Sequence, residues 1–185
     1  MDRRGVLRVG LVATVSLVVA PRARATLARA LRVEELVARS QHVLLGDPLE
    51  AYCAWALIGD RKHIVTYTRV RALELLAGAD PKQDELLVRT LGGRVDNLGE
   101  LVAGEAQIAP GERSVLFVTP AREAMAVTAM AQGHYPLAAD HAGVEHLSRS
   151  AQAGDLMSVD GSAVKRLHGL ALSDARALLR SVVHK

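Results

Sequence analysis

A long run of strand-forming residues, HIVTYTRVRALELLAG at positions 63 to 78, constrains the fold of this chain more than any other segment. The run is dense in β-branched and aromatic side chains, and no proline interrupts it, which is typical of a long, partly buried strand. A related run, ELLVRTLGGRV, follows at positions 85 to 95. Together the two runs predict a small, mainly β domain with the first run as its central strand.

The residues before the central run predict two shorter strands. One covers 42–46, and a second runs up to Ile58, because Pro48 cannot donate a hydrogen bond within a central ladder and favours a turn. The polar connection 59–62 is short enough for a hairpin into the central strand. Within that strand the alternation of side chains is imperfect, and we therefore expect a bulge near Arg71.

The rest of the chain predicts further strands and two flanking helices. Residues 94–112 contain turn signals and are expected to form a loop, while strands are expected at 113–119 and 124–131. An amphipathic pattern predicts an entry helix within 26–39, and Ser173 is expected to cap a C-terminal helix. The expected fold class is therefore a small OB-like β-barrel with flanking N- and C-terminal α-helices.

The first 25 residues have the pattern of an export signal. A basic start, MDRRGVLR, precedes the uncharged apolar run VGLVATVSLVVA and then PRARA, in which Ala23 and Ala25 fit an A-x-A cleavage site. The apolar run is too short to span a bilayer comfortably. Cleavage after Ala25 is expected to leave a mature chain that begins at Thr26, although a second A-x-A at Ala28 and Ala30 leaves the exact position open.

Arg3 and Arg4 resemble the paired arginines of twin-arginine export signals, which carry folded proteins across the membrane. Two positions depart from that motif, because Asp2 stands where serine or threonine is preferred and Val6 where phenylalanine is common. General secretory export and an uncleaved anchor therefore remain alternatives. Each cleavable route predicts a periplasmic or secreted protein with no stable membrane insertion after cleavage.

The basic character of the chain belongs largely to this leader. The whole chain has 23 basic and 20 acidic residues, and the first 25 positions contain five of the basic residues and one of the acidic ones. The remaining 18 basic and 19 acidic residues leave a formal charge of −1. The aromatic share of 3% is also low for a surface that stacks on bases. We therefore expect no nucleic-acid partner.

The predicted organisation has three parts. Residues 1–25 form the cleavable, twin-arginine-like signal peptide, 26–147 form the β-barrel domain with its entry helix, and 148–185 form a polar linker and the C-terminal helix. The single cysteine, Cys53, excludes an intramolecular disulfide, and its apolar setting indicates a small buried hydrophobe. A role as a nucleophile or in an intermolecular link is the alternative.

The order of these segments resembles the netrin-like, or tissue-inhibitor-of-metalloproteinase-like (TIMP-like), OB-fold barrel. The phrases that carry the resemblance are LVARSQHVLLG, TYTRVRALELLAG, LLVRTLGG and PGERSVLFV, and it covers about residues 31 to 131. The chain is also similar to uncharacterised secreted bacterial proteins of the same shape. The resemblance implies a small OB-fold barrel preceded by an entry helix.

The inhibitory chemistry of the animal members of that family is not implied. Those inhibitors begin with a cysteine that chelates the zinc ion of the protease, and several disulfides hold them together. Here the expected first residue is Thr26 and the only cysteine is Cys53.

Two sets of residues are candidates for binding. Gly92, Gly93 and Arg94 form one predicted rim loop, and His134 and Tyr135 follow Gly133 in another, since loops at barrel rims commonly carry function. A tight turn between strands would explain the first set equally well. Neither set has the context of a phosphate-binding loop.

A third set could bind a metal ion. Asp140, His141 and His146 lie close together with Glu145, and imidazole and carboxylate groups are ligands for zinc, copper or manganese. Their spacing does not place two histidines on one helical face, so a solvated turn is the alternative interpretation. No cofactor is expected unless this cluster binds a metal.

Two functions from different classes are consistent with the chain. The first is an exported, non-catalytic interaction module that binds an extracytoplasmic protein or an envelope component through its barrel loops. The alternative is a small metal-dependent or redox protein that uses His134, His141 and His146. Ser162 is an isolated serine in a polar segment, and the chain has neither a G-x-S-x-G nor a His-Glu-x-x-His motif.

Overall fold

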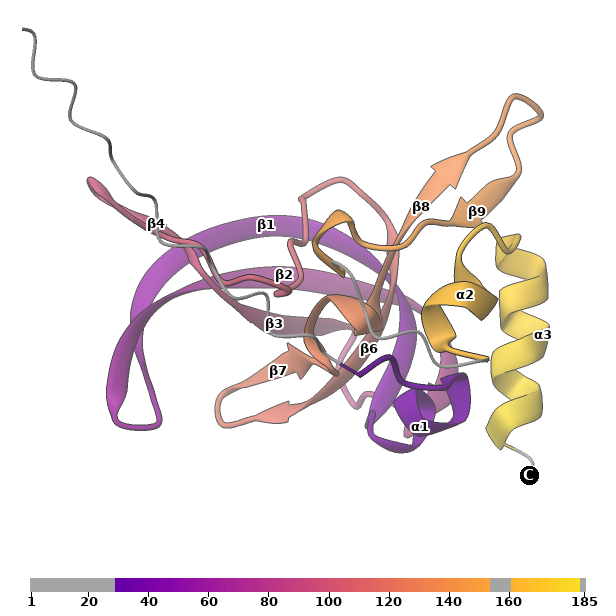
Figure 1. Ribbon diagram of the computed structural model, residues 1–185, viewed down its shortest axis with the longest axis horizontal. Helices are drawn as coiled ribbons and strands as arrows, with labels where there is room; N and C mark the ends of the chain where they lie inside the picture. The colour runs from indigo at the N-terminus through magenta and orange to yellow at the C-terminus, as the bar shows by residue number, and fades with distance from the viewer. Residues whose placement is uncertain (1–28, 154–160, 184–185) are drawn as a thin grey trace, which may run out of the picture.

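Five strands close into a ring in the computed structural model, which describes residues 29–153 and 161–183 (Figure 1). In their order around the ring they are β1 (His42–Ile58), β2 (Arg61–Gly78), β3 (Glu85–Leu91), β7 (Ala124–Val127) and β6 (Ser114–Ala121). The pairing of β1 with β6 closes the ring, and β3 with β7 is its parallel pair. The predicted fold class, a small OB-like β-barrel with flanking helices, is confirmed.

Shorter elements surround the ring. Strands β8 (His134–Ala139) and β9 (Glu145–Leu147) extend the sheet beyond β6, while β4 (Gly93–Val95) and β5 (Leu98–Glu100) form a separate two-stranded sheet. The helical elements are α1 (Val33–Ala38), α2 (Ala163–Leu167), α3 (Leu172–Val183) and the short 3-10 turns η1 (Met130–Gly133) and η2 (Ala151–Ala153). In Figure 1, α1, α2 and α3 gather on one side of the barrel.

The interior of the ring is filled by branched aliphatic side chains. Strand alternation turns every second residue of each strand inward. The inward-facing cluster contains Leu44, Val70, Val88, Leu116, Val118 and Val127, together with Ala106 and Ile108 from the segment before β6. These last two residues cover one end of the barrel, so the segment that contains them forms part of the core.

A second core lies between the outer wall of the barrel and the three helices. The opposite faces of β1 and β6 contribute Val43, Leu45, Val115 and Phe117, and the helices contribute Val33, Leu36, Leu167, Ala175 and Leu179. Both faces are therefore buried at the start of β1 and of β6, which explains the apolar runs Val43–Leu45 and Val115–Val118. Arg176 and Arg180 of α3 also contact Glu74 of β2 at 2.8 and 3.3 Å.

The turn predicted at Gly46–Pro48 does not form, and β1 is one continuous strand from His42 to Ile58. The proline is tolerated because β6 pairs with β1 only up to Gly46, so Pro48 lies where one edge of β1 becomes free. The register with β2 shifts between Pro48 and Glu50. A local irregularity therefore replaces the expected break.

Other boundaries also differ from the prediction. The bulge expected near Arg71 is present at Leu73, and the register with β1 shows a second one at Leu76. The segment predicted as a loop from 94 to 112 contains most of the β4–β5 hairpin. Helix α3 begins at Leu172, which places Ser173 inside its first turn instead of at the cap.

The residues of the predicted export signal, Arg3, Arg4, Ala23 and Ala25, lie outside the described residues. In the described part of the chain, none of the helices has the length and apolar character needed to cross a membrane.

Candidate functional site

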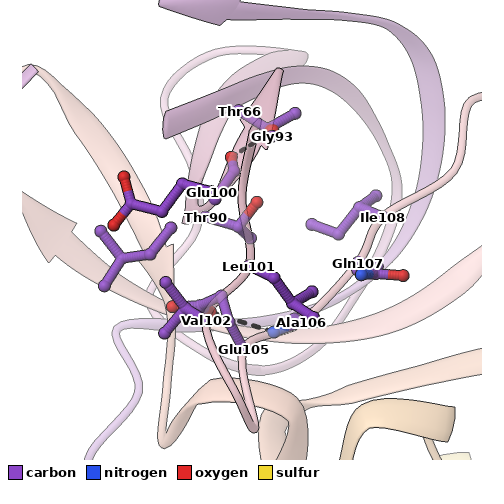
Figure 2. Close-up of a pocket in the computed structure, with 12 residues that line it drawn as sticks. Thr66, Thr90, Gly93, Glu100, Leu101, Val102, Glu105, Ala106, Gln107 and Ile108 are labelled. Carbon is purple, nitrogen blue, oxygen red and sulfur yellow. Dashed lines mark hydrogen bonds between the residues drawn. The ribbon is translucent and has the colours of Figure 1, made fainter. Parts of the chain in front are cut away.

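A cavity of about 240 Å³ opens at one end of the barrel, where the connection after β5 passes over the ends of β2 and β3 (Figure 2). Its wall contains Thr66 of β2, Thr90 and Leu91 of β3, the glycine pair 92–93, and much of the segment from 100 to 108. Figure 2 shows Thr90 on one side of the open space, with Gln107 and Ile108 on the other. The site therefore combines rigid strands with one long connection.

The glycine pair shapes one wall of this cavity. Gly92 and Gly93 have φ angles of 96° and 133°, which L-residues with a side chain rarely adopt. A Cβ on Gly93 would lie 2.6 Å from both Cys53 Sγ and Thr66 Oγ1, so only glycine lets β4 cross so close to β1 and β2. The Thr66 hydroxyl donates a hydrogen bond to the Gly92 carbonyl at 2.8 Å. The structure thus places both predicted glycines at the cavity.

Glu100 ties the far end of the β4–β5 hairpin to β2. Its Oε1 lies 2.6 Å from His63 Nδ1, and its Oε2 accepts a hydrogen bond from the Ile64 backbone N–H, also at 2.6 Å. These hydrogen bonds hold the pKa of Glu100 below its usual value. In Figure 2 its carboxylate points away from the cavity. Glu100 therefore positions the segment that follows it.

Glu105 is the buried carboxylate of the cavity wall. Its Oε1 accepts a hydrogen bond from the Ala106 backbone N–H at 3.0 Å, and burial raises its pKa above the usual value. Apolar residues of the cavity wall precede and follow Glu105 in the sequence: Val102 comes before it, and Ala106 and Ile108 come after it. The carboxylate folds the connection back on itself and brings those apolar side chains to the cavity.

Two leucines in and just after β5 are strongly exposed, and one of them lines the cavity. Leu101, which follows β5 and lines the cavity, is 83% exposed, and Leu98, at the start of β5, is 60% exposed. Leaving such side chains in water is unfavourable, and exposed apolar groups beside a concave, partly apolar wall are typical of an interaction site. Sequence reasoning placed this segment in a loop but missed both leucines, because an isolated leucine in a loop carries no periodic signal.

The third residue predicted for this rim, Arg94, is not part of the cavity wall. It is exposed on β4, and its Nε donates a hydrogen bond to the Asp96 carbonyl at 3.2 Å. This bond closes the turn between β4 and β5, where Asp96 has a φ of 52°. Arg94 therefore stabilises the hairpin tip.

His134 and Tyr135 do not form the rim loop that was predicted for them. Both lie in β8, opposite Leu116 and Val115 of β6, and both are buried. Burial lowers the pKa of His134 to about 4 and raises that of Tyr135 above its usual value. The glycine and proline around them suggested a turn, but the sheet pairs this segment directly after η1.

The predicted metal ligands lie in and beside the turn between β8 and β9. His146 Nε2 is 3.1 Å from Asp140 Oδ2, and its Nδ1 is 3.2 Å from the Gly169 carbonyl. Asp140 Oδ1 accepts hydrogen bonds from the backbone N–H groups of Ala142 and Val144. These contacts raise the pKa of His146 and lower that of Asp140. The pair thus stabilises the hairpin turn.

The structure does not bring the remaining predicted ligands to this pair. His141 is exposed in the turn, and His134 is buried near the opposite end of β8. Across residues 29–153 and 161–183, no three His, Cys, Asp or Glu side chains come together in a group that could hold a metal ion. Ser162, in turn, caps α2, because its hydroxyl accepts a hydrogen bond from the Lys165 N–H at 3.4 Å.

Comparison with known proteins leaves the site without a precedent. Neither the models of protein families, nor the curated proteins, nor the solved structures contain a match to this chain. The function is therefore inferred from the geometry of the cavity and the residues around it.

Proposed function

We propose that the protein is an exported, non-catalytic interaction module that binds a protein or an envelope component through the loop at the barrel mouth. The observation that carries this proposal is the exposed Leu101 in the wall of a cavity that also contains Val102, Ala106 and Ile108. A second exposed leucine, Leu98, lies three residues earlier on β5. This arrangement suits the insertion of an apolar side chain of a partner. The partner would in turn cover the two leucines.

The size of the cavity favours a side chain over a larger molecule. Its volume of about 240 Å³ is below the range of roughly 300–1,000 Å³ that is usual for sites of drug-sized ligands. Full burial of one leucine contributes about 1.5–3 kcal/mol. Two leucines and one inserted side chain are therefore enough for a specific contact if the loop is already ordered.

The loop is held in place before any partner arrives. Glu100 binds His63 and Ile64 on β2, and Glu105 accepts a hydrogen bond within the connection. A preorganised loop loses little conformational entropy on binding, so more of the contact energy remains for affinity. We place the protein in the periplasm or outside the cell, because the leader MDRRGVLRVGLVATVSLVVAPRARA has the pattern of an export signal.

Site-specific photo-crosslinking tests this function. A photoreactive amino acid replaces Leu101 in the full-length chain, the exported fraction of the host is irradiated, and adducts are identified by mass spectrometry. Val144 serves as the matched control position because it is also apolar and exposed but lies in the β8–β9 turn. We expect one defined adduct from position 101 and none from position 144, on a mature chain that begins at Thr26.

Leu98→Asp provides the second control. This change leaves the crosslinker in place but adds a charge beside it, so it should lower the yield of the adduct at least several-fold. Identical adducts at positions 101 and 144, or a yield at 101 that Leu98→Asp leaves unchanged, would contradict the proposal. The partner identified in the adduct is then purified, and its affinity for the wild type and for Leu98→Asp is measured by titration.

A further inference from the structure

Beyond the end of the pairing with β6, Glu50–Ile58 of β1 and Arg61–Arg69 of β2 form an arm. β3 pairs with the β2 side of this arm from Val65 to Arg69, and the rest of the arm is two-stranded. β6 pairs with β1 only from His42 to Gly46, whereas β2 pairs with β1 as far as Ile58. Among the described residues, no strand pairs with the outer edge of β1 from Glu50 to Ile58. Figure 1 shows β1 and β2 curving away from the ring together, joined at a hairpin end. The arm therefore offers a row of backbone N–H and C=O groups.

The free edge has none of the usual protection against strand pairing. Between Ala51 and Ile58 the sequence AYCAWALI contains no charged residue and no proline. Natural edge strands that stay unpaired carry lysine, proline or an inward-pointing charge. Only an extended strand satisfies a row of alternating donors and acceptors, so the chemistry of the edge specifies β-strand addition.

Both faces of this strand are apolar, and the described chain covers them only in part. Tyr52, on one face, is 55% exposed, and Trp55 and Leu57, on the other, are 49% and 51% exposed. A strand that is apolar on both faces is typical of one that lies inside a larger sheet. Tyr52 stacks on Tyr67 of β2, with ring centroids 5.3 Å apart, which joins the two strands of the arm on that face.

We propose that the outer edge of β1 pairs with the same edge of a second copy of this chain. The two strands run antiparallel about a two-fold axis near Ala54, and the two arms form one continuous sheet. In this register large side chains oppose small ones, because Trp55 faces Cys53 of the second copy and Tyr52 faces Ala56 of the second copy. Such alternation of size allows close packing across the pair.

The charges at the two ends of the arm favour this antiparallel arrangement. The tip contains Asp60, Arg61 and Lys62, which leaves one positive charge. At the base, Asp47, Glu50 and Glu85 surround Arg69 and Arg71, which leaves one negative charge. Antiparallel pairing places the tip of each arm beside the base of the other, so opposite charges meet. Parallel pairing would place like charges together.

Sedimentation across a range of concentrations tests the pairing. The mature chain is purified in reducing buffer, because Cys53 is its single cysteine and a disulfide must not create the dimer. We expect a monomer–dimer equilibrium for the wild type and a monomer for Trp55→Lys at every concentration. Leu73→Lys is the matched control, since Leu73 is similarly exposed but lies on β2 away from the free edge, and it should dimerise like the wild type.

A charge-swap experiment tests the register. Ala54→Lys and Ala54→Glu each place like charges near the axis, so each protein alone should be a monomer. An equimolar mixture of the two should form a heterodimer, and far-ultraviolet circular dichroism confirms that both variants remain folded. A wild type that stays monomeric, or a dimer that Trp55→Lys does not weaken, would overturn the proposal. So would homodimers of both Ala54 variants with no preference for the mixture.

Discussion

At the scale of single residues, four buried polar atoms have no hydrogen-bond partner in the described part of the chain. They are Thr68 Oγ1, Ser114 Oγ, His134 Nδ1 and Tyr135 OH. An unsatisfied buried group costs free energy because it has left water and gained no partner in exchange. Two of the four, His134 and Tyr135, are neighbours on β8, where sequence reasoning expected an exposed loop.

We predict that Tyr135→Phe leaves the free energy of unfolding unchanged or raises it slightly. The ring of Tyr135 packs edge-on against Phe117 with centroids 6.0 Å apart, and phenylalanine keeps that contact while it removes the unpaired hydroxyl. Tyr67→Phe is the control, because the Tyr67 hydroxyl donates to Glu123 Oε1 at 3.0 Å. It should cost about 1 kcal/mol. Urea unfolding measures both, and a larger loss for Tyr135→Phe would contradict the prediction.

We also predict that His134 makes the fold sensitive to mild acid. Burial lowers its pKa from 6.5 to about 4, so between these values the unfolded chain binds a proton that the folded protein does not. Stability is therefore greatest above pH 6.5 and falls as the pH drops towards 4. At about 1.4 kcal/mol per pKa unit, the full loss is roughly 3 kcal/mol.

The comparison of the wild type with His134→Leu isolates this effect. Other groups titrate in the same range, including Glu105, whose raised pKa opposes the trend, but they are common to both proteins. Urea unfolding at several pH values should give a steeper fall in stability for the wild type than for the variant. If the free energy of unfolding falls equally with pH in both proteins, His134 is not the cause of the acid sensitivity.

At the scale of elements, close approaches of the backbone fix where the long strands end. Gly78 ends β2 with a φ of 88°, and a Cβ there would lie 2.4 Å from the Gln41 carbonyl oxygen just before β1. Gly59 has a φ of 64° at the hairpin between β1 and β2, and nothing lies within 4 Å of its Cβ position. The two glycines thus share a conformation but differ in their surroundings.

We predict that Gly78→Ala destabilises the protein much more than Gly59→Ala does. A positive φ costs an alanine about 1 kcal/mol at either position. At Gly78 the overlap with backbone adds roughly 1–3 kcal/mol, because a carbonyl oxygen cannot rotate away as a side chain can. Thermal or urea unfolding of the two variants measures the difference. Equal losses would mean that β2 can shift to relieve the contact.

Element types were easier to predict than their limits. The β-branched density of 63–78 identified β2, but the sequence favoured a break at Pro48, where β1 is continuous, and an exposed loop at His134 and Tyr135, where β8 begins. In both cases the residues favour a turn locally, but pairing with strands distant in the sequence determines the structure. A proline at the point where β1 leaves β6 removes no ladder hydrogen bond, and this position is visible only once the sheet is assembled.

At the scale of the whole molecule, one strand pair closes the barrel and the helices complete it. The outer wall of the barrel is too apolar to face water, and α1, α2 and α3 bury it in a shared core with Phe117 and Tyr135. The C-terminal segment predicted as a linker and helix therefore packs against the barrel through Leu167 and Leu179. The arm of β1 and β2 is the long apolar part of the sheet that this core leaves uncovered.

The sequence by itself determined the mainly β fold class, the central strand, the glycine pair at the mouth and the pattern of an export signal, because each depends on local residue types and spacing. Only the tertiary structure decided the continuous β1, the burial of His134 and Tyr135, and the cavity beside Leu101. These features depend on which strands pair at a distance in the sequence. Pairing at that range is set by the packing of the assembled core, which no local pattern encodes.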